Sequence, residues 1–134
     1  MNRKTARENA FILLFELSSK TDETAEEIFD KRLSIGELEV DAYVKEVFFG
    51  VNENLKMIDE TMEKSLVGWK SQRLSLVSRA VIRLAIYELM FMEDVPCKVS
   101  INEAIELSKK YDDEKAYMLV NGVLNASAEA LGRK

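Results

Sequence analysis

The chain has 134 residues, of which 47% are hydrophobic and 32% are charged, an ordinary balance for one globular domain. It contains one cysteine and no histidine, which excludes an internal disulfide, an imidazole base and the usual zinc sites. The net charge of −5 argues against indiscriminate binding to nucleic acid. We expect a reducing cytoplasm as the location, and we interpret Cys97 as a packing residue and not a nucleophile.

The charge is unevenly distributed along the chain. Residues 1–20 carry four bases and two acids, and residues 66–92 carry four bases and one acid. Between them, residues 21–65 carry five bases and thirteen acids. The two basic segments indicate either chance variation in surface charge or a local anion-binding face. No uncharged run reaches the roughly 18 to 20 residues of a membrane span, and the basic start does not have the form of a signal peptide.

The first helix is expected over residues 5–17, where apolar residues recur at spacings of three and four. These residues are Ala6, Ala10, Leu13, Leu14 and Leu17. A polar break follows at residues 18–22. Thr24-Ala25-Glu26-Glu27 then has the form of a capping box, which predicts a short helix that ends near Leu33.

Ser34-Ile35-Gly36-Glu37 repeats the capping pattern and predicts the start of a longer helix. Its inward residues are expected to be Val40, Val44, Val47, Phe48, Val51 and Leu55. A break near residues 52–54 would precede a shorter helix over residues 57–66. Gly50 lies inside this pattern at an intrinsic cost of about 1 kcal/mol, which a close approach between two helices would explain.

Residues 75–92 form the most apolar predicted helix, which is therefore expected at the centre of the fold. Asp94-Val95-Pro96 ends it, because proline cannot continue a helix. Ser100-Ile101-Asn102-Glu103 has the form of a third capping box and predicts a helix through Lys110. The last helix is expected over residues 115–131. The chain is thus predicted to be an all-α protein with about seven helices, forming a single domain over residues 1–134.

No pattern in the sequence supports catalysis. Neither GxxxxGK nor GxGxxG occurs, so there is no phosphate-binding glycine loop. Asp112-Asp113-Glu114 lacks the spacing of a calcium loop and is interpreted as a helix-capping loop. We therefore expect no enzyme activity, no cofactor and no metal ion.

Binding is the remaining class of function. Arg3 and Arg7 are four residues apart with Lys4 beside them, and Arg79 and Arg83 repeat this spacing on the central helix. Guanidinium groups bind phosphates through paired hydrogen bonds and stack on bases, so these residues favour nucleic-acid binding. A solubilising terminus and intramolecular salt bridges are the alternative explanation.

Three parts of the chain, in order, resemble the NusB family. They are residues 3–10 (RKTARENA), residues 69–74 (WKSQRL) with 79–89 (RAVIRLAIYEL), and residues 94–96 (DVP) with 99–111 (VSINEAIELSKKY) and 120–124 (VNGVL). The resemblance implies a fold of two packed three-helix bundles. It also implies a cytoplasmic transcription antitermination factor that binds single-stranded boxA RNA of ribosomal RNA leaders together with NusE, a ribosomal small-subunit protein. The complex would act on elongating RNA polymerase through other Nus factors.

By matching positions, the resemblance places seven residues on the RNA side, where the cations would converge on one strip. They are Arg3, Lys4, Arg7, Arg79, Arg83, Leu119 and Asn121. Tyr87, Glu88, Asn102 and Glu103 also match the family and are interpreted mainly as determinants of the fold. Gly122, inside the last helix, indicates either close backbone packing, which is favoured, or room for RNA.

The chain departs from the family pattern at two places. Ser78 stands where many members have Asp, and Met118-Leu119 stands where many have Lys-Phe. Loss of that lysine and ring removes a cation and a stacking surface, which predicts weaker RNA affinity and a greater reliance on the partner protein. Two other interpretations stay open: a non-catalytic accessory domain of an RNA methyltransferase, and a protein-binding scaffold or homodimer.

Overall fold

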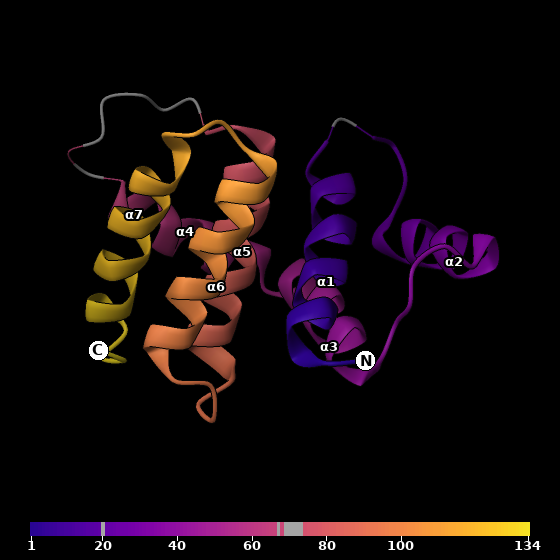
Figure 1. Cartoon of the computed structure of the whole chain (residues 1–134), viewed down its shortest axis with the longest axis horizontal. Coiled ribbons are helices and arrows are strands. Elements are labelled where there is room, and N and C mark those ends of the chain that lie inside the picture. The colour runs from indigo at the N-terminus through magenta and orange to yellow at the C-terminus, as the bar shows by residue number, and fades with distance from the viewer. Residues whose placement is uncertain (20, 67, 69–73) are drawn as a thin grey trace.

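The computed structural model describes residues 1–19, 21–66, 68 and 74–134. Within this part of the chain there are seven α-helices and no strand, so the predicted all-α class and helix number are confirmed (Figure 1). No helix of the described residues has both the length and the hydropathy of a membrane crossing. The helices are α1 (Arg3–Ser18), α2 (Ala25–Ile35), α3 (Ala42–Glu53), α4 (Leu55–Ser65), α5 (Leu76–Phe91), α6 (Cys97–Tyr111) and α7 (Ala116–Ala130).

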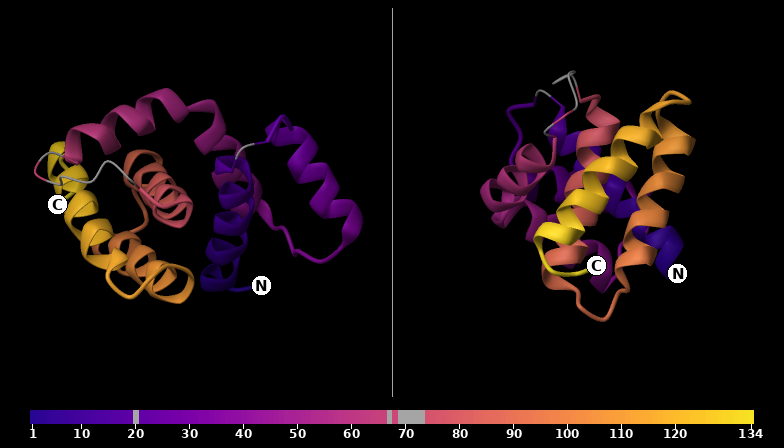
Figure 2. Two further views of the ribbon diagram at one scale, coloured as in Figure 1. Left: turned by 90° about the horizontal axis from the view of Figure 1, so that it is seen from above. Right: turned by 90° about the vertical axis from the view of Figure 1, so that its left-hand side faces the viewer.

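The helices form two packed groups, as the resemblance implied, although the second group has four helices and not three. Helices α1, α2 and α3 make the first group, and α4, α5, α6 and α7 make the second. Helix α5 joins the groups because it packs against α1 and α3 on one side and against α4, α6 and α7 on the other sides. Seen from above, α4 and α6 lie on opposite sides of α5, and α6 lies between α1 and α7 (Figure 2).

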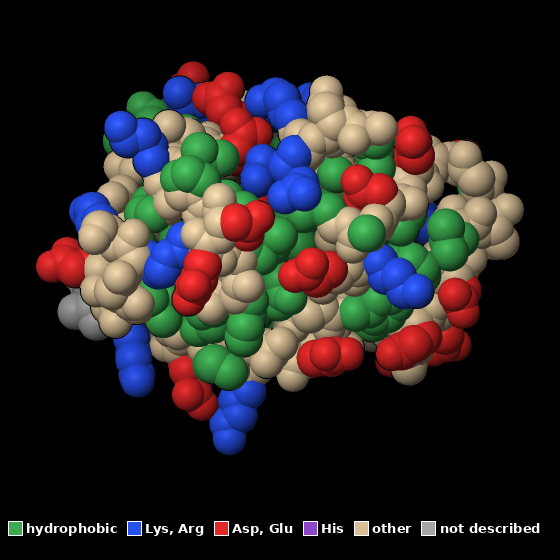
Figure 3. Space-filling view, turned by 90° about the horizontal axis from the view of Figure 1, so that it is seen from below, with side chains coloured by type: hydrophobic (Ala, Val, Ile, Leu, Met, Phe, Trp, Pro, Cys, Tyr) green, Lys and Arg blue, Asp and Glu red, His purple; other side chains and the backbone are tan. Residues whose placement is uncertain are grey.

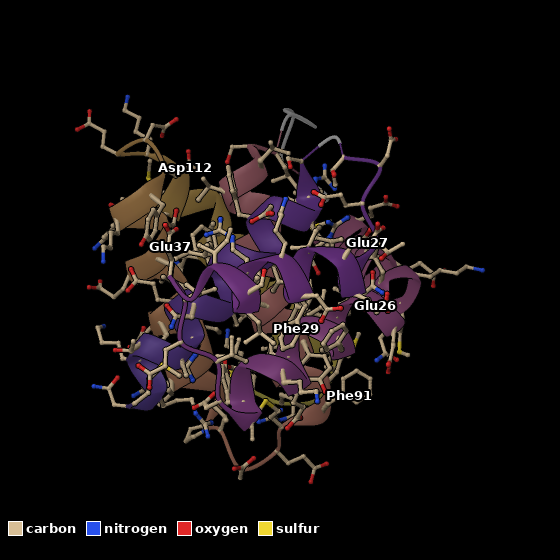
Figure 4. The ribbon with its side chains drawn as sticks, turned by 90° about the vertical axis from the view of Figure 1, so that its right-hand side faces the viewer. Glu26, Glu27, Phe29, Glu37, Phe91 and Asp112 are labelled. Atoms are coloured by element: carbon tan, nitrogen blue, oxygen red, sulfur yellow. The ribbon has the colours of Figure 1, made fainter. Side chains whose placement is uncertain are left out.

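Helix α2 begins with the capping box predicted from the sequence. The Thr24 hydroxyl accepts a hydrogen bond from the Glu27 amide at 3.1 Å, and the Glu27 carboxylate accepts one from the Thr24 amide at 2.9 Å. Phe29, labelled with Glu27 in Figure 4, then packs against the rings of Phe48 and Phe49 on α3. Local capping and aromatic contacts therefore fix α2 on the first group.

The capping box predicted at Ser34 is wrong. Ser34 lies in the last turn of α2, and its hydroxyl donates to the carbonyl of Lys31 at 2.9 Å. Gly36 ends the helix with φ 77°, a left-handed conformation that favours glycine. The next helix begins only after Asp41, whose carboxylate accepts from the Val44 amide at 2.9 Å. Gly36, which the sequence pattern placed at the start of a helix, instead ends the preceding helix.

The capping box predicted at Ser100 is also wrong, because α6 begins three residues earlier. The carbonyl of Pro96 accepts the amides of Val99 and Ser100 at 2.9 and 3.2 Å, so the helix starts directly after the proline. Ser100 lies in the second turn, and its hydroxyl donates to the buried carboxylate of Glu88 at 2.7 Å. The hydroxyl is used for a tertiary contact and not for a cap.

The acidic loop between α6 and α7 acts as a helix cap, as interpreted from its spacing. Asp113 accepts the amides of Lys115 and Ala116 at 3.0 Å each. Its neighbour Asp112 accepts the hydroxyls of Ser75 and Ser78 at 2.5 and 2.9 Å. The loop therefore ties the start of α5 to the junction of α6 and α7.

The expected break and the close helix approach are both confirmed in α3 and α4. The two helices meet at Asn54, whose amide side chain donates to the carbonyl of Gly50 at 2.8 Å. A Cβ atom at Gly50 would lie 2.5 Å from Cζ and 2.6 Å from the hydroxyl oxygen of Tyr87 on α5. Only glycine leaves room for this ring, whose hydroxyl donates to Glu46 at 3.2 Å.

We predict that Gly50→Ala destabilises the protein, although alanine has the better helix propensity. The new methyl group would push the Tyr87 ring away from Glu46 and from Phe91, whose ring centroid lies 5.0 Å away. Overpacking of this kind costs about 1–3 kcal/mol, measurable as a lower free energy of unfolding in urea. In a Tyr87→Leu background the same change should cost much less; an equal cost in both backgrounds would contradict the steric explanation.

Candidate RNA-binding surface

A single buried carboxylate joins the two helix groups. Glu88 on α5 is completely buried, and three other helices each supply one side chain that donates to it. Arg7 Nε on α1 donates at 2.8 Å, and the Ser100 hydroxyl on α6 donates at 2.7 Å. The Tyr43 hydroxyl on α3 donates to the same carboxylate. We refer to Arg7, Tyr43, Glu88 and Ser100 as the Glu88 cluster.

Burial and charge act in opposite directions within the Glu88 cluster. Burial works against the charge on Arg7, but its hydrogen bond and attraction to Glu88 outweigh this and raise the pKa of the guanidinium. Burial, reinforced by the negative charge of Glu88, raises the pKa of the Tyr43 hydroxyl, which therefore remains a donor. A buried ion pair with further hydrogen bonds of this kind fixes one arrangement of α1, α3, α5 and α6.

Two exposed cations extend from this cluster at the start of α1. The guanidinium carbon of Arg3 lies 4.3 Å from the centroid of the Tyr43 ring, within the range of cation–π attraction. The Lys4 ammonium lies 3.6 Å from Glu103 on α6, and the same carboxylate lies 3.5 Å from Arg7 Nη1. Arg3 and Lys4 are therefore solvent-exposed charges held by residues that are themselves fixed by packing.

A cleft of about 170 Å³ continues from Lys4 between α1 and α6. Glu8 lies across it and accepts hydrogen bonds from Lys110 at 2.5 Å and from the Tyr111 hydroxyl at 2.6 Å. These two bonds lower the pKa of Glu8, with the bond from Lys110 the larger cause. The Glu8 carboxylate therefore compensates the charge of Lys110 at the far end of the cleft.

The other predicted cations do not join Arg3 and Lys4. Arg83 makes a two-pronged salt bridge with Asp59 on α4, with both contacts at 2.9 Å, and donates to the Ser18 hydroxyl at 3.1 Å. This places Arg83 on the α4 side of α5, whereas Lys4 faces α6 (Figure 2). Arg79 lies one turn before Arg83 on α5. It precedes Glu88 by nine residues, or about two and a half helical turns, so the two side chains leave α5 on roughly opposite sides. The contacts of Arg83 therefore do not support the single strip expected from the sequence.

The two remaining predicted site residues, Leu119 and Asn121, lie on α7. Leu119 is half-buried and packs against the core, while Asn121 is exposed and its carbonyl and side-chain oxygens both accept from Asn125 at 2.9 Å. Residues 69–73, which form most of the resembling stretch 69–74, lie outside the described residues. At the end of the molecule where α1 and α6 begin, basic and acidic side chains are interspersed, and no single broad basic field covers it (Figure 3).

Two residues of this surface were not found from the sequence. No sequence pattern identified Tyr43, because the position of its ring under Arg3 depends on packing between two helices that are distant in the sequence. Glu103 was assigned to a helix cap, whereas it pairs with Lys4 and Arg7. Glu88 was interpreted as a determinant of the fold, and its position in the core agrees with that.

The fold and this surface define a small all-α protein in which two helix groups share a buried polar cluster and present basic side chains at the start of the first helix. The chain belongs to the NusB family, whose model matches residues 4–129.

Three similar proteins support the assignment. The transcription antitermination protein NusB of Clostridium botulinum is 45% identical over 129 residues, which cover 93% of this chain and 96% of that protein. The structure of NusB from T. maritima has a TM-score of 0.82 and 38% identity, covering 96% of this chain and 92% of that one. A chain in the crystal structure of the antitermination factors NusB and NusE in complex with double-stranded RNA has a TM-score of 0.81 and 32% identity, covering 96% of both chains.

We predict that Arg7→Met lowers the free energy of unfolding by about 3–5 kcal/mol, because Glu88 would remain buried without its counter-ion. Arg7→Met with Glu88→Gln should be more stable than Arg7→Met alone, since no charge is then buried; the amide oxygen can accept from one of the Tyr43 and Ser100 hydroxyls, and the amide nitrogen can donate to the other. Urea unfolding measures both. Lys4→Met, at an exposed pair, is the control and should change stability little; equal losses for Arg7→Met and Lys4→Met would contradict the assignment.

Proposed function

We propose that this protein is a transcription antitermination factor that binds the boxA RNA of nascent ribosomal RNA together with NusE. The observation that carries the proposal is membership of the NusB family over residues 4–129, combined with exposed, positioned cations at the start of α1. A structural neighbour, a complex of NusB and NusE with double-stranded RNA, supports both partners. Residues 1–134 would act as one cytoplasmic unit that supports elongation by RNA polymerase through other Nus factors.

In this proposal the protein acts by binding and not by catalysis. Arg3 and Lys4 are the direct phosphate contacts, because both are exposed and both are held in place by neighbouring side chains. Arg7 contributes indirectly, since its guanidinium is buried against Glu88 and orients the first turns of α1. Arg79, Arg83, Leu119 and Asn121 would have to meet RNA on other faces of the molecule.

The accessory-domain alternative is not favoured by the relatives. The Clostridium botulinum protein and the two structures are covered over 92–96% of their own length, so the similarity is to chains of comparable size. A homodimer remains a prediction, and gel filtration with and without boxA RNA tests it. RNA that dissociates a dimer would indicate that the dimer covers the RNA-binding surface.

The direct test is a titration of labelled boxA RNA and of a scrambled RNA, each with and without NusE. We expect Arg3→Ala with Lys4→Ala to weaken binding of both RNAs and to reduce the slope of log K against log salt by about 1.4, or about 0.7 for each lost phosphate contact. Lys45→Ala with Lys56→Ala, which removes two exposed lysines from α3 and α4, should leave the slope unchanged. An unchanged slope in the first variant would contradict the proposed contacts.

A second prediction concerns the departure from the family pattern at the start of α7. Met118 is 48% exposed and Leu119 is half-buried, so a lysine and a ring can be placed there. Met118→Lys with Leu119→Phe should raise the affinity of the isolated protein for boxA RNA by about tenfold, because a stacked base contributes roughly 1–3 kcal/mol. The advantage conferred by NusE should then become smaller. Unaltered affinity at equal stability would show that RNA does not reach this part of α7.

A further inference from the structure

A groove of about 370 Å³ runs between α6 and α7 on the side of α6 away from α1. Its lining includes the exposed residues Lys98, Asn102 and Asn121 and the half-buried residues Asn125 and Arg133. Among the described residues that line it there is no Asp or Glu. The groove therefore differs from the α1–α6 cleft, which Glu8, Glu103 and Glu106 help to line.

The positive charge in this groove is held in position. Arg133 donates to the backbone carbonyls of Leu89 and Val95, the latter at 2.8 Å, which anchors its guanidinium beside the end of α5. Lys98 lies in the first turn of α6, where the free amides of a helix start add to the positive potential. An anionic group in the groove would thus meet the anchored guanidinium of Arg133 and the exposed ammonium of Lys98.

The two asparagines of α7 form a polar pair inside the same groove. The Asn125 amide nitrogen donates at 2.9 Å to both the carbonyl and the side-chain oxygen of Asn121. Neither bond uses the Asn121 amide nitrogen, which is a donor, or the Asn125 side-chain oxygen, which is an acceptor. A donor and an acceptor on neighbouring amide side chains are the groups that read the edge of a nucleobase, whereas a purely electrostatic contact would require only cations.

The groove is next to the proposed phosphate contacts. Asn102 lines the groove, and its neighbour Glu103, about 100° further round α6, pairs with Lys4 on α1. A single strand held by Arg3 and Lys4 therefore needs only to cross the first turns of α6 to reach the groove. Helix α6 lies between α1 and α7 along this route (Figure 2).

We propose that the α6–α7 groove is a nucleotide-binding subsite for single-stranded RNA, with Lys98 as a phosphate contact and Asn121 and Asn125 as contacts to a base edge. The inference rests on the proposed RNA-binding function and extends it to a face that the basic start of α1 does not cover. The two kinds of contact have different consequences: Lys98 contributes affinity for any RNA, and the asparagine pair contributes discrimination between sequences.

The test uses the full chain, with labelled boxA RNA and a scrambled RNA of the same length. Lys98→Ala should weaken binding of both RNAs and reduce the salt slope by about 0.7. Lys56→Ala is the matched control, because Lys56 is an exposed lysine on α4, on the far side of α5 from α6. Asn125→Ala should leave the salt slope unchanged but lower the ratio of boxA to scrambled affinity by about tenfold.

Each outcome decides the proposal. If the wild-type protein binds boxA RNA and both variants bind as it does, the groove assignment is overturned while the proposed function stands. If the wild-type protein binds no boxA RNA, both are overturned. The groove assignment is also overturned if poly-glutamate displaces the labelled RNA as effectively as unlabelled boxA RNA does, because binding would then depend only on negative charge. In the supporting result, both variants also unfold at the same temperature as the wild-type protein, which shows that the change in binding is not caused by unfolding.

Discussion

The completely buried carboxylate of Glu88 is the constraint on which this structure depends. A charge in the core is stable only when enough donors surround it, and here the donors are Arg7, Tyr43 and Ser100 from three other helices. If α1 or α3 docked on α5 in another register, at least one of these donors would be lost. Apolar contacts alone tolerate small shifts between helices, so the polar cluster is what makes the joint between the two helix groups specific.

The same cluster determines what the surface presents. Arg3 lies over the ring whose hydroxyl reaches Glu88, and Lys4 pairs with the carboxylate that also approaches Arg7. These exposed side chains therefore lose less conformational freedom on binding than free surface cations would. The Glu88 cluster thus both stabilises the core and positions the candidate RNA contacts, which places the candidate surface at the joint between the helix groups.

The sequence was most informative where a structural feature depends on neighbouring residues. Apolar spacing predicted the helices, and the break at Asn54 and the close approach at Gly50 were inferred correctly from residues within a few positions. The capping boxes at Ser34 and Ser100 failed because the four-residue pattern cannot report the true partner of a hydroxyl. For Ser34 the partner is the preceding turn, and for Ser100 it is a carboxylate twelve positions earlier in the core.

The candidate site was harder to predict, because two arginines at helical spacing lie in opposite environments, one exposed and one buried. Arg3 and Arg7 are four residues apart on one helix, yet Arg3 is exposed and Arg7 is buried against a residue 81 positions away. Arg83, in a basic segment, has its charge compensated by Asp59 from an acidic segment. The net charge of a segment is therefore not the charge of the surface it forms, because ion pairs between segments must first be subtracted. After that subtraction the accessible positive charge near Arg3 is smaller than the sequence indicated, which is a physical reason to expect that the proposed RNA binding depends on a protein partner.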